Sequence, residues 1–206
     1  MAELRVPPGR AGRLRLRRGL EVARRGADLL DRKLRVLRAR HEELLRAEGE
    51  ARERWHARLT EAESWLRRGL ILGGEEALDE TAVRRPAELE VTWTSTMGVR
   101  HPRAAMCAVP EPDPDEPAPA NTALVHAEAG YADAVRAGAE YAAAAAAARA
   151  VGDELLATRR RVRALRRHWI PRLEAALARV DAGLEQNEHE DAVRRKWVAD
   201  LQARGR

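Results

Sequence analysis

Hydrophobic residues recur in alternating steps of three and four along two long stretches of the chain. The first stretch runs from Leu16 to Trp65 with few polar interruptions and no internal proline. A seven-residue repeat held this long is typical of a coiled-coil helix. It predicts one helix over residues 10–70, ending near the glycines at 69, 73 and 74. The proposed seam of this helix includes Leu20, Leu30, Leu34 and Leu37.

The second stretch begins at Asn121 or Thr122, either of which can cap a helix, and continues to about Arg204. Its apolar positions step from Leu165 by four and again by four around Pro171, which marks an inserted offset in the repeat. Proline removes a backbone donor and clashes with the preceding turn, so we expect a bend at Pro171. The proposed seam of this helix includes Val162, Leu165, Leu177 and Val180.

Seven consecutive alanines, Ala142–Ala148, make part of the second stretch narrow and strongly helical. Two interpretations stay open for this run. It is either filler of high helix propensity, or a place where a partner helix or subunit approaches the backbone closely.

The residues between the two stretches have a different pattern. Residues 75–84 predict a short helix, and Glu88–Thr94 alternates between apolar and polar as a strand does. Met97 and Gly98 can turn the chain, and Val99–Val109 predicts a returning strand that Pro102 interrupts. Val91, Trp93 and Met97 then form either a functional face of the hairpin or plain packing against the helices. A linker of prolines and acids follows over residues 110–119, and no helix or strand is expected there.

These elements predict an all-α fold, in which two long helices form an antiparallel coiled coil with a small central insert that contains a β-hairpin. Three segments follow: an N-terminal helix over 1–72, the insert over 73–121 and a C-terminal helix over 122–206. A single hairpin is marginally stable alone, so it must pack against a helix. The insert is expected at or near one tip of the coiled coil, and both chain ends at the other.

Composition supports long helices over a compact enzyme. The 206 residues contain 34% charged and 3% aromatic side chains and no phenylalanine, so few large side chains exist to fill a broad core. The chain has no apolar run long enough to span a membrane and no secretory signal at its start. Cys107 is its single cysteine, which favours a reducing cytoplasm.

The formal charge of +5 arises from 38 basic and 33 acidic residues, and all but Lys33 and Lys196 of the basic ones are arginines. Because acids alternate with arginines, most of this charge predicts a solvated helix surface. The basic residues near both ends are the best candidates for electrostatic contact with a partner, although an ordinary charged surface explains each as well: Arg10, Arg13, Arg17, Arg194, Arg195 and Lys196.

The sequence carries no catalytic signature. Gly73-Gly74 is followed by two glutamates in place of a phosphate-binding lysine, and the six histidines lack metal-ligand spacing. Cys107 has no signature of a nucleophile. We therefore expect no catalytic residue, cofactor or metal.

Three blocks in order resemble the D subunit of the V-type and A-type rotary ATPases. The chain opens with Val6-Pro-Pro-Gly-Arg and Arg25-Gly-Ala-Asp-Leu-Leu-Asp-Arg-Lys, and carries Val91-Thr-Trp-Thr-Ser-Thr-Met-Gly-Val-Arg in its middle. The most specific block runs from Thr158-Arg-Arg-Arg-Val-Arg-Ala-Leu through Ile170-Pro-Arg-Leu-Glu to Glu188-His-Glu-Asp-Ala-Val-Arg-Arg-Lys. Gly9 stands where the family usually has threonine, and Arg163 where it has asparagine.

The resemblance implies a non-catalytic rotor shaft that stands in a hexamer of catalytic and non-catalytic subunits and couples ATP hydrolysis or synthesis to rotation of a membrane ring that carries H+ or Na+. Its implied partners are that hexamer, a small companion subunit and a socket subunit above the ring. Its implied location is the cytoplasmic side of the membrane, and the hairpin is associated with stimulation of the ATPase.

Two other classes remain as alternatives. A free-standing arginine-rich coiled coil that binds nucleic acid would lose affinity steeply with salt. Base-stacking aromatics do not accompany the basic residues, which argues against it. An enzyme would need a convergent set of titratable residues, which the sequence does not suggest.

Overall fold

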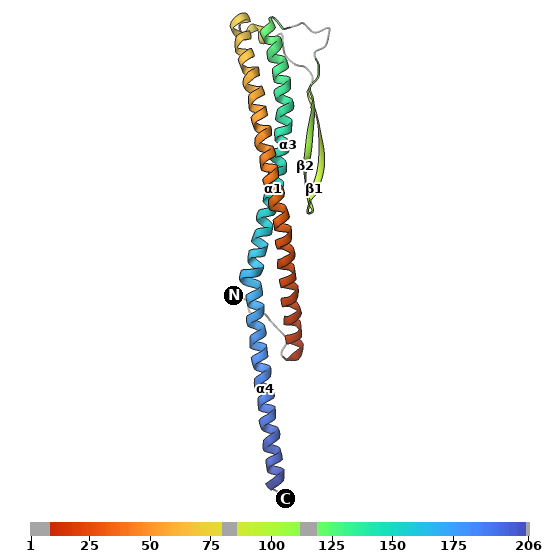
Figure 1. The fold of residues 1–206 in the computed structure, drawn as a ribbon, viewed down its shortest axis with the longest axis vertical. Helices are drawn as coiled ribbons and strands as arrows, with labels where there is room; N and C mark the ends of the chain where they lie inside the picture. Colours follow the sequence, from red (N-terminus) through yellow and green to blue (C-terminus); the bar gives the residue numbers. More distant parts are fainter. Residues whose placement is uncertain (1–8, 80–85, 112–118, 205–206) are drawn as a thin grey trace. The chain divides into compact units, whose positions relative to one another are not determined.

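The computed structural model describes residues 9–79, 86–111 and 119–204. They form two compact units, Met1–Leu34 with Ala157–Arg206 (unit 1) and Arg35–Leu156 (unit 2), each considered by itself below. The elements are α1 (Arg10–Gly73), α2 (Glu76–Asp79), β1 (Glu88–Thr96), β2 (Val99–Ala108), α3 (Thr122–Ala164), a π-helical turn η1 (Leu165–Trp169) and α4 (Ile170–Arg204). The predicted all-α fold with a small hairpin is confirmed (Figure 1).

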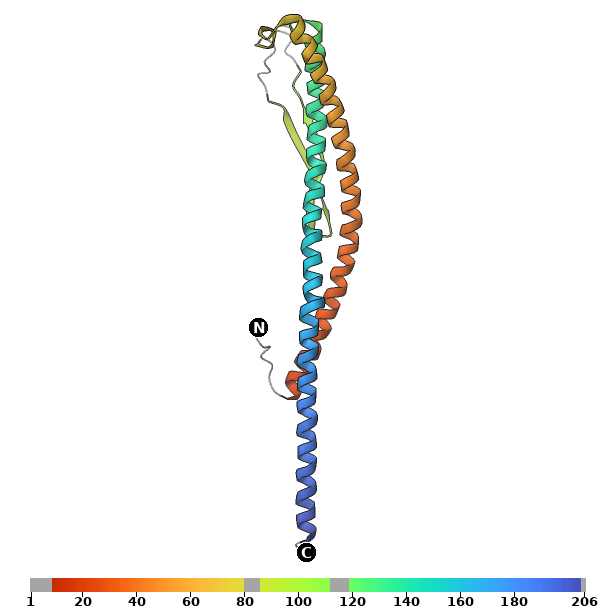
Figure 2. The same ribbon diagram turned by 90° about the vertical axis from the view of Figure 1, so that its left-hand side faces the viewer.

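In unit 2, the second half of α1 lies antiparallel beside the first half of α3 (Figures 1 and 2). Large residues of α1 pack against smaller residues of α3. Leu37 and Leu44 of α1 form one cluster with Ala147, Ala148 and Val151 of α3. Leu37 and Val151 are fully buried. This complementarity of leucine and alanine fills the seam without large side chains on both helices.

Glycines of α3 bring the two helices into close approach. A Cβ placed on Gly130 would lie 3.1 Å from both Cα and Cβ of Ala62, and one on Gly138 would lie 3.2 Å from the indole nitrogen of Trp55. The Trp55 ring stacks on Tyr141 with centroids 5.4 Å apart. Each glycine thus accepts a specific residue of α1, which helps to fix how the two helices align.

The tip of unit 2 is closed by Asn121. Its side-chain oxygen accepts a hydrogen bond from the Leu124 amide at 3.0 Å, and its side-chain nitrogen donates to the Gly69 carbonyl at 3.1 Å. The same residue therefore caps α3 and ties it to the last turns of α1. Gly74 follows α1 with a φ of 70°, the left-handed conformation that commonly ends a helix. Both predicted helix boundaries are confirmed.

The hairpin turns at Met97 and Gly98, which both have positive φ (50° and 83°) between the paired residues Thr96 and Val99. Two positive φ values are typical of the tight turn whose twist matches that of the strands. Val99 packs against the Leu37 cluster, so the hairpin leans on the helix pair as expected. Figure 1 shows the strands running alongside α3 rather than beyond its end, so the hairpin folds back from the tip along the helix pair.

One expectation about the strands is wrong. Pro102 does not interrupt β2, because the register shifts between Thr92 and Trp93 and leaves Arg103 as an extra residue in β2. A bulge of this kind gives proline a place in a continuous strand. In the hairpin, Trp93 of β1 is 52% exposed, while His101 of β2 is fully buried.

Of the predicted helix over 75–84, the structure has α2 as far as Asp79, and the remainder lies outside the described residues, as does most of the proline linker. The alanine run is helical throughout, and four of its members are buried: Ala143, Ala145, Ala147 and Ala148. Because Val99 of the hairpin and Leu37 of α1 both pack against the cluster that contains this run, close approach of neighbouring elements explains the alanines.

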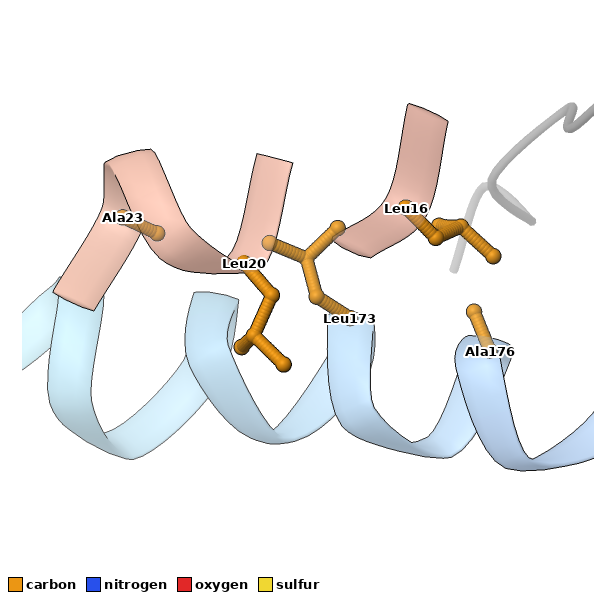
Figure 3. Close-up of a cluster of buried hydrophobic side chains, with 5 residues drawn as sticks. All are labelled: Leu16, Leu20, Ala23, Leu173 and Ala176. Carbon is orange, nitrogen blue, oxygen red and sulfur yellow. The ribbon is translucent and has the colours of Figure 1, made fainter. Parts of the chain in front are cut away.

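In unit 1, the first turns of α1 pack antiparallel against α4 (Figure 3). Leu16, Leu20 and Ala23 interlock with Leu173 and Ala176. Ion pairs flank this core: Arg13–Asp181 (2.7 Å), Arg24–Glu174 (2.7 Å), Arg10–Glu188 (3.2 Å), and Arg166 with both Asp28 and Asp31. All of these pairs except Arg13–Asp181 are exposed, and exposed ion pairs contribute little stability, so the apolar core is the main contact between the two helices.

The offset around Pro171 takes the form of a π-helical turn. The amide of Ile170 bonds to the carbonyl of Leu165, five residues back rather than four. One extra residue in the turn lets Leu165 and Leu173 lie on the same side of the helix pair despite their spacing of eight. Trp169, which the repeat places in the seam, is 41% exposed instead. The predicted bend at Pro171 stays a prediction.

Candidate partner-binding surface

The last part of α4 presents an apolar stripe that the described chain leaves uncovered. The seam of unit 1 ends at Leu184, and every side chain described from Glu185 onward is exposed. Val193, Trp197 and Leu201 follow one another at intervals of four residues, with exposed fractions of 53%, 69% and 56%. Residues four apart share one face of a helix, so these side chains form a continuous stripe. This stripe is therefore a candidate interaction surface.

Three predicted contact residues lie on this same stretch of α4. Arg194 is 4.0 Å from carboxylates of Glu190 and Asp191 on its own helix, and the guanidinium of Arg195 donates to the Asp191 carbonyl. Lys196 is exposed. At 3.6 residues per turn, Arg194 and Lys196 flank the apolar stripe, whereas Arg195 lies on the opposite side of α4. A partner at the stripe would therefore meet apolar and positive groups together.

The predicted contact residues of α1 are placed differently. Arg13 pairs with Asp181 at 2.7 Å, and the two paired atoms are shielded from water. Arg10 pairs with Glu188 on the surface, and Arg17 is exposed. Arg13 therefore serves the contact between helices, while Arg10 and Arg17 remain accessible to a partner.

The proposed seam residues differ in burial. Leu37 is fully buried, and Leu20, Leu34 and Val162 are at most 9% exposed. Leu30, Leu165, Leu177 and Val180 are half-buried. Leu177 and Val180 pack against the core of unit 1.

The hairpin offers a second exposed surface. Trp93 and Met97 are half-exposed, and the guanidinium of Arg100 lies 4.7 Å from the centroid of the Trp93 ring. The packing interpretation is therefore wrong for Trp93 and Met97. Val91 is half-buried, and Gly98 serves the turn. Arg100 orients the exposed ring through a cation–π contact.

His101 is the one fully buried histidine among the described residues, and the sequence did not single it out. Its Nδ1 donates to the Pro102 carbonyl at 2.9 Å, and its Nε2 lies 3.0 Å from the Thr96 hydroxyl. Both ring nitrogens thus have partners inside the hairpin. The histidine stabilises the turn end of the hairpin and leaves no nitrogen for a ligand.

The described parts of the chain contain no group of three or more histidine, cysteine, aspartate or glutamate side chains that could hold a metal ion. Cys107 is a half-buried free thiol. Among the residues with described positions, no helix combines the length and apolar composition that crossing a membrane requires.

Sequence reasoning found the cations of α4 but missed the apolar stripe beside them. Val193 and Trp197 fall outside the seam repeat, which continues through Val198 and Leu201 instead. The signal was present as three large apolar residues at intervals of four, with Val198 next to Trp197, in a segment that is otherwise rich in charged residues. The sequence alone could not show that the described part of α1 leaves the side chains of Val193, Trp197 and Leu201 exposed.

Comparison with known proteins gives consistent matches over almost the whole chain. A family model for the D subunit of ATP synthase matches residues 13–200. The V-type ATP synthase D subunit of Anaeromyxobacter sp. (strain Fw109-5) is 32% identical over 197 residues, covering 93% of this chain and 92% of the relative. The A-type ATP synthase D subunit of Methanopyrus kandleri is 28% identical over 204 residues, covering 95% and 86%.

Proposed function

Because the chain belongs to the family of ATP synthase D subunits, we propose that it is the non-catalytic central shaft of a V/A-type ATPase or ATP synthase. In this proposal the catalytic hexamer binds and cleaves ATP, and the chain transmits rotation between that hexamer and a membrane ring that carries H+ or Na+. Its other partners are a small companion subunit and a socket subunit above the ring. The complex holds it at the cytoplasmic face of the membrane.

The observation that carries the proposal is the exposed end of α4. A helix that continues beyond its packing partner, with Val193, Trp197 and Leu201 on one side and cations next to them, is suited to entering another protein. Interfaces combine an apolar centre with charged groups around it. We propose that this segment stands in the bore of the hexamer.

Interlocked helices suit a mechanical role. Side chains packed at native density resist deformation, so a torque applied to one helix of a pair passes to the other. A single asymmetric shaft favours a different conformation at each interface of the surrounding ring. Rotation and nucleotide occupancy then influence each other reciprocally, as linked binding equilibria must.

The test is reconstitution with the catalytic hexamer of the same organism on a sizing column, with ATPase activity measured across the peak. We expect one copy of the chain per hexamer and an altered ATPase rate. Failure to co-elute in any nucleotide state would refute the proposal.

A double variant and a matched control test whether the end of α4 makes the contact with the hexamer. Trp197→Asp combined with Leu201→Asp should weaken association with the hexamer at least tenfold and return the ATPase rate toward that of the hexamer alone. The matched control is Val125→Asp on α3, where the side chain is 45% exposed. Thermal unfolding of the double variant should be unchanged, because both side chains are exposed. Normal co-elution of the double variant would exclude the end of α4 as the contact.

A further inference from the structure

One side of the helix formed by α3 and the π-helical turn carries exposed arginines that have no acidic neighbour. Seven arginines and no aspartate or glutamate lie between Glu154 and Glu174. Arg160, Arg163 and Arg167 recur there at intervals of three and four residues, so they share one side of the helix, and all three are exposed. Within the described chain, none of their three guanidinium groups has an ion pair or a hydrogen bond. These three residues form the arginine stripe.

The arginine stripe points away from the contact with α1. Thr158 and Val162 are buried, and at about 3.6 residues per turn they lie on the opposite side of the helix. The carboxylates of α1 next to this part of the chain are already paired, because Asp28 and Asp31 both contact Arg166. The stripe therefore presents its charge to solvent and is not neutralised within the described part of unit 1.

Several other exposed arginines of this chain have a carboxylate one helical turn away. Examples are the pairs Arg58–Glu61 and Arg136–Asp133. In the arginine stripe, the residues three and four positions from each arginine include another arginine and no acid. Like charges at these spacings destabilise a helix. The stripe thus has a cost in stability that an anionic partner would remove on binding.

The spacing of the stripe suits the side chains of a second helix. At a rise of about 1.5 Å per residue, the backbone positions of the three arginines are about 4.5 and 6 Å apart along the axis. A helix that lies alongside has the same rise and period, so glutamates at matching intervals can face all three guanidinium groups. Each guanidinium can hold a carboxylate through two parallel N–H···O bonds.

A nucleic acid fits the stripe less well. Its affinity grows with the number of phosphates that the protein neutralises, and the stripe offers only three cations over about 10 Å of helix. Beyond Arg167 the same side of the chain continues with Pro171 and Ala175, which carry no charge. A long polyanion therefore leaves the positive surface after a few phosphates, whereas a short acidic helix matches its length.

We infer that the arginine stripe is a docking surface for an acidic helix of a partner protein. Glutamates or aspartates on one side of that helix pair with the three arginines and relieve their mutual repulsion. The inference goes beyond the shaft role proposed above. Its test needs no ATPase, so either proposal can fail without the other.

The test uses the full chain and a fluorescently labelled helical peptide of alanine and glutamine, with three glutamates at intervals of four and three residues along one side. Fluorescence anisotropy measures binding at an ionic strength of about 0.01 M, where charges act over about 30 Å, and again at about 0.15 M. Two control peptides should bind at least tenfold more weakly. One has the same composition with its glutamates spread around the helix, and the other has lysine in place of glutamate.

Two variants of equal net charge provide the second arm. The stripe variant replaces all three arginines of the stripe: Arg160→Gln, Arg163→Gln and Arg167→Gln. The control variant removes the same charge from arginines that already pair on their own helix: Arg40→Gln, Arg58→Gln and Arg136→Gln. The stripe variant should bind the acidic peptide at least tenfold more weakly than the parent chain, and the control variant should bind it equally well.

Thermal unfolding separates lost binding from lost folding. The stripe variant should unfold at the same temperature as the parent chain or at a higher one, because its substitutions remove like charges from one side of the helix. Weaker peptide binding by a chain that is at least as stable then reports on the surface itself.

Several results would overturn the inference. They are an unchanged anisotropy at millimolar protein, equal binding by the stripe and control variants, and equal binding of either control peptide. A short DNA duplex that binds through the stripe more tightly than the acidic peptide would also overturn it, by assigning this surface to a nucleic acid.

Discussion

Single residues decide how closely the helices of unit 2 can approach. At Gly130 the backbone of α1 lies so near that a Cβ would be only 3.1 Å from the Cα of Ala62. Gly49, on the exposed side of α1, has no neighbour within 4 Å of an added Cβ. The two glycines have the same helical conformation and opposite surroundings, so they form a matched pair for substitution.

Gly49→Ala should raise the free energy of unfolding by about 0.5–1 kcal/mol, since alanine loses less entropy than glycine on entering a helix. Gly130→Ala should lower it by about 1–3 kcal/mol, because the new methyl group forces the helices apart. Urea unfolding followed by circular dichroism measures both. Equal stabilisation by the two substitutions would show that the close approach at Ala62 is relaxed in solution.

Among the elements, helix ends and helix seams depend on different forces. Asn121 satisfies a backbone amide at the start of α3 and a carbonyl near the end of α1, so its contribution comes from hydrogen bonds. Leu37 has an apolar side chain and contributes by its complete burial. Each can be tested separately.

Asn121→Ala should destabilise the chain by about 1–2 kcal/mol, because it removes the cap of α3. Asn121→Asp keeps an acceptor for the Leu124 amide but loses the donor to Gly69, so it should cost less than alanine. The midpoint of urea unfolding gives the comparison. An aspartate variant as unstable as the alanine variant would assign the effect to the Gly69 bond instead of the cap.

Leu37→Ala should destabilise unit 2 by about 2–5 kcal/mol, the cost of removing buried methyl groups and leaving a cavity. Leu29→Ala is the control, since Leu29 belongs to the same helix and is 62% exposed. Its effect should stay within about 0.5 kcal/mol. Thermal unfolding of both variants measures the loss of stability at each position. Similar losses at Leu37 and Leu29 would contradict the burial of Leu37 in the seam.

For the whole molecule, the decisive property is how its charge is distributed. The excess of basic over acidic residues is small, and several arginines of unit 1 pair with carboxylates across the helix contact, including Arg13, Arg24 and Arg166. Cations neutralised within the protein release few counterions from a nucleic acid. The high arginine content therefore gives little affinity for DNA.

The chain should bind a short DNA duplex no more tightly than about 100 µM at about 0.15 M salt, the weak end of non-specific binding. Fluorescence anisotropy over a series of salt concentrations measures the affinity and its slope. Micromolar affinity for the duplex at low salt that falls steeply as the salt concentration rises would support the nucleic-acid hypothesis for this chain.

Much of the fold follows from local patterns. The repeat predicted both long helices, and their ends at Gly74 and Asn121 were predicted because capping chemistry acts within a few residues. Met97-Gly98 predicted the turn for the same reason. Of the candidate partner-binding surface, the sequence singled out the cations Arg194 and Lys196 but not the apolar stripe that they flank, and their contact with a partner stays a prediction. Exposure of that stripe depends on where the opposite helix stops.

Periodicity and the chemistry of neighbouring residues were enough to assign the helices, the turn and the seam away from Trp169, since these depend on short-range order along the chain. The folded chain was needed to show which segments meet: Gly130 with Ala62, Arg13 with Asp181, and Val99 with the Leu37 cluster. It was also needed to show that the offset near Pro171 becomes a π-helical turn and that Arg103 is an extra residue in β2. Such contacts join residues far apart in the chain, and a local pattern carries no information about the partner across a seam.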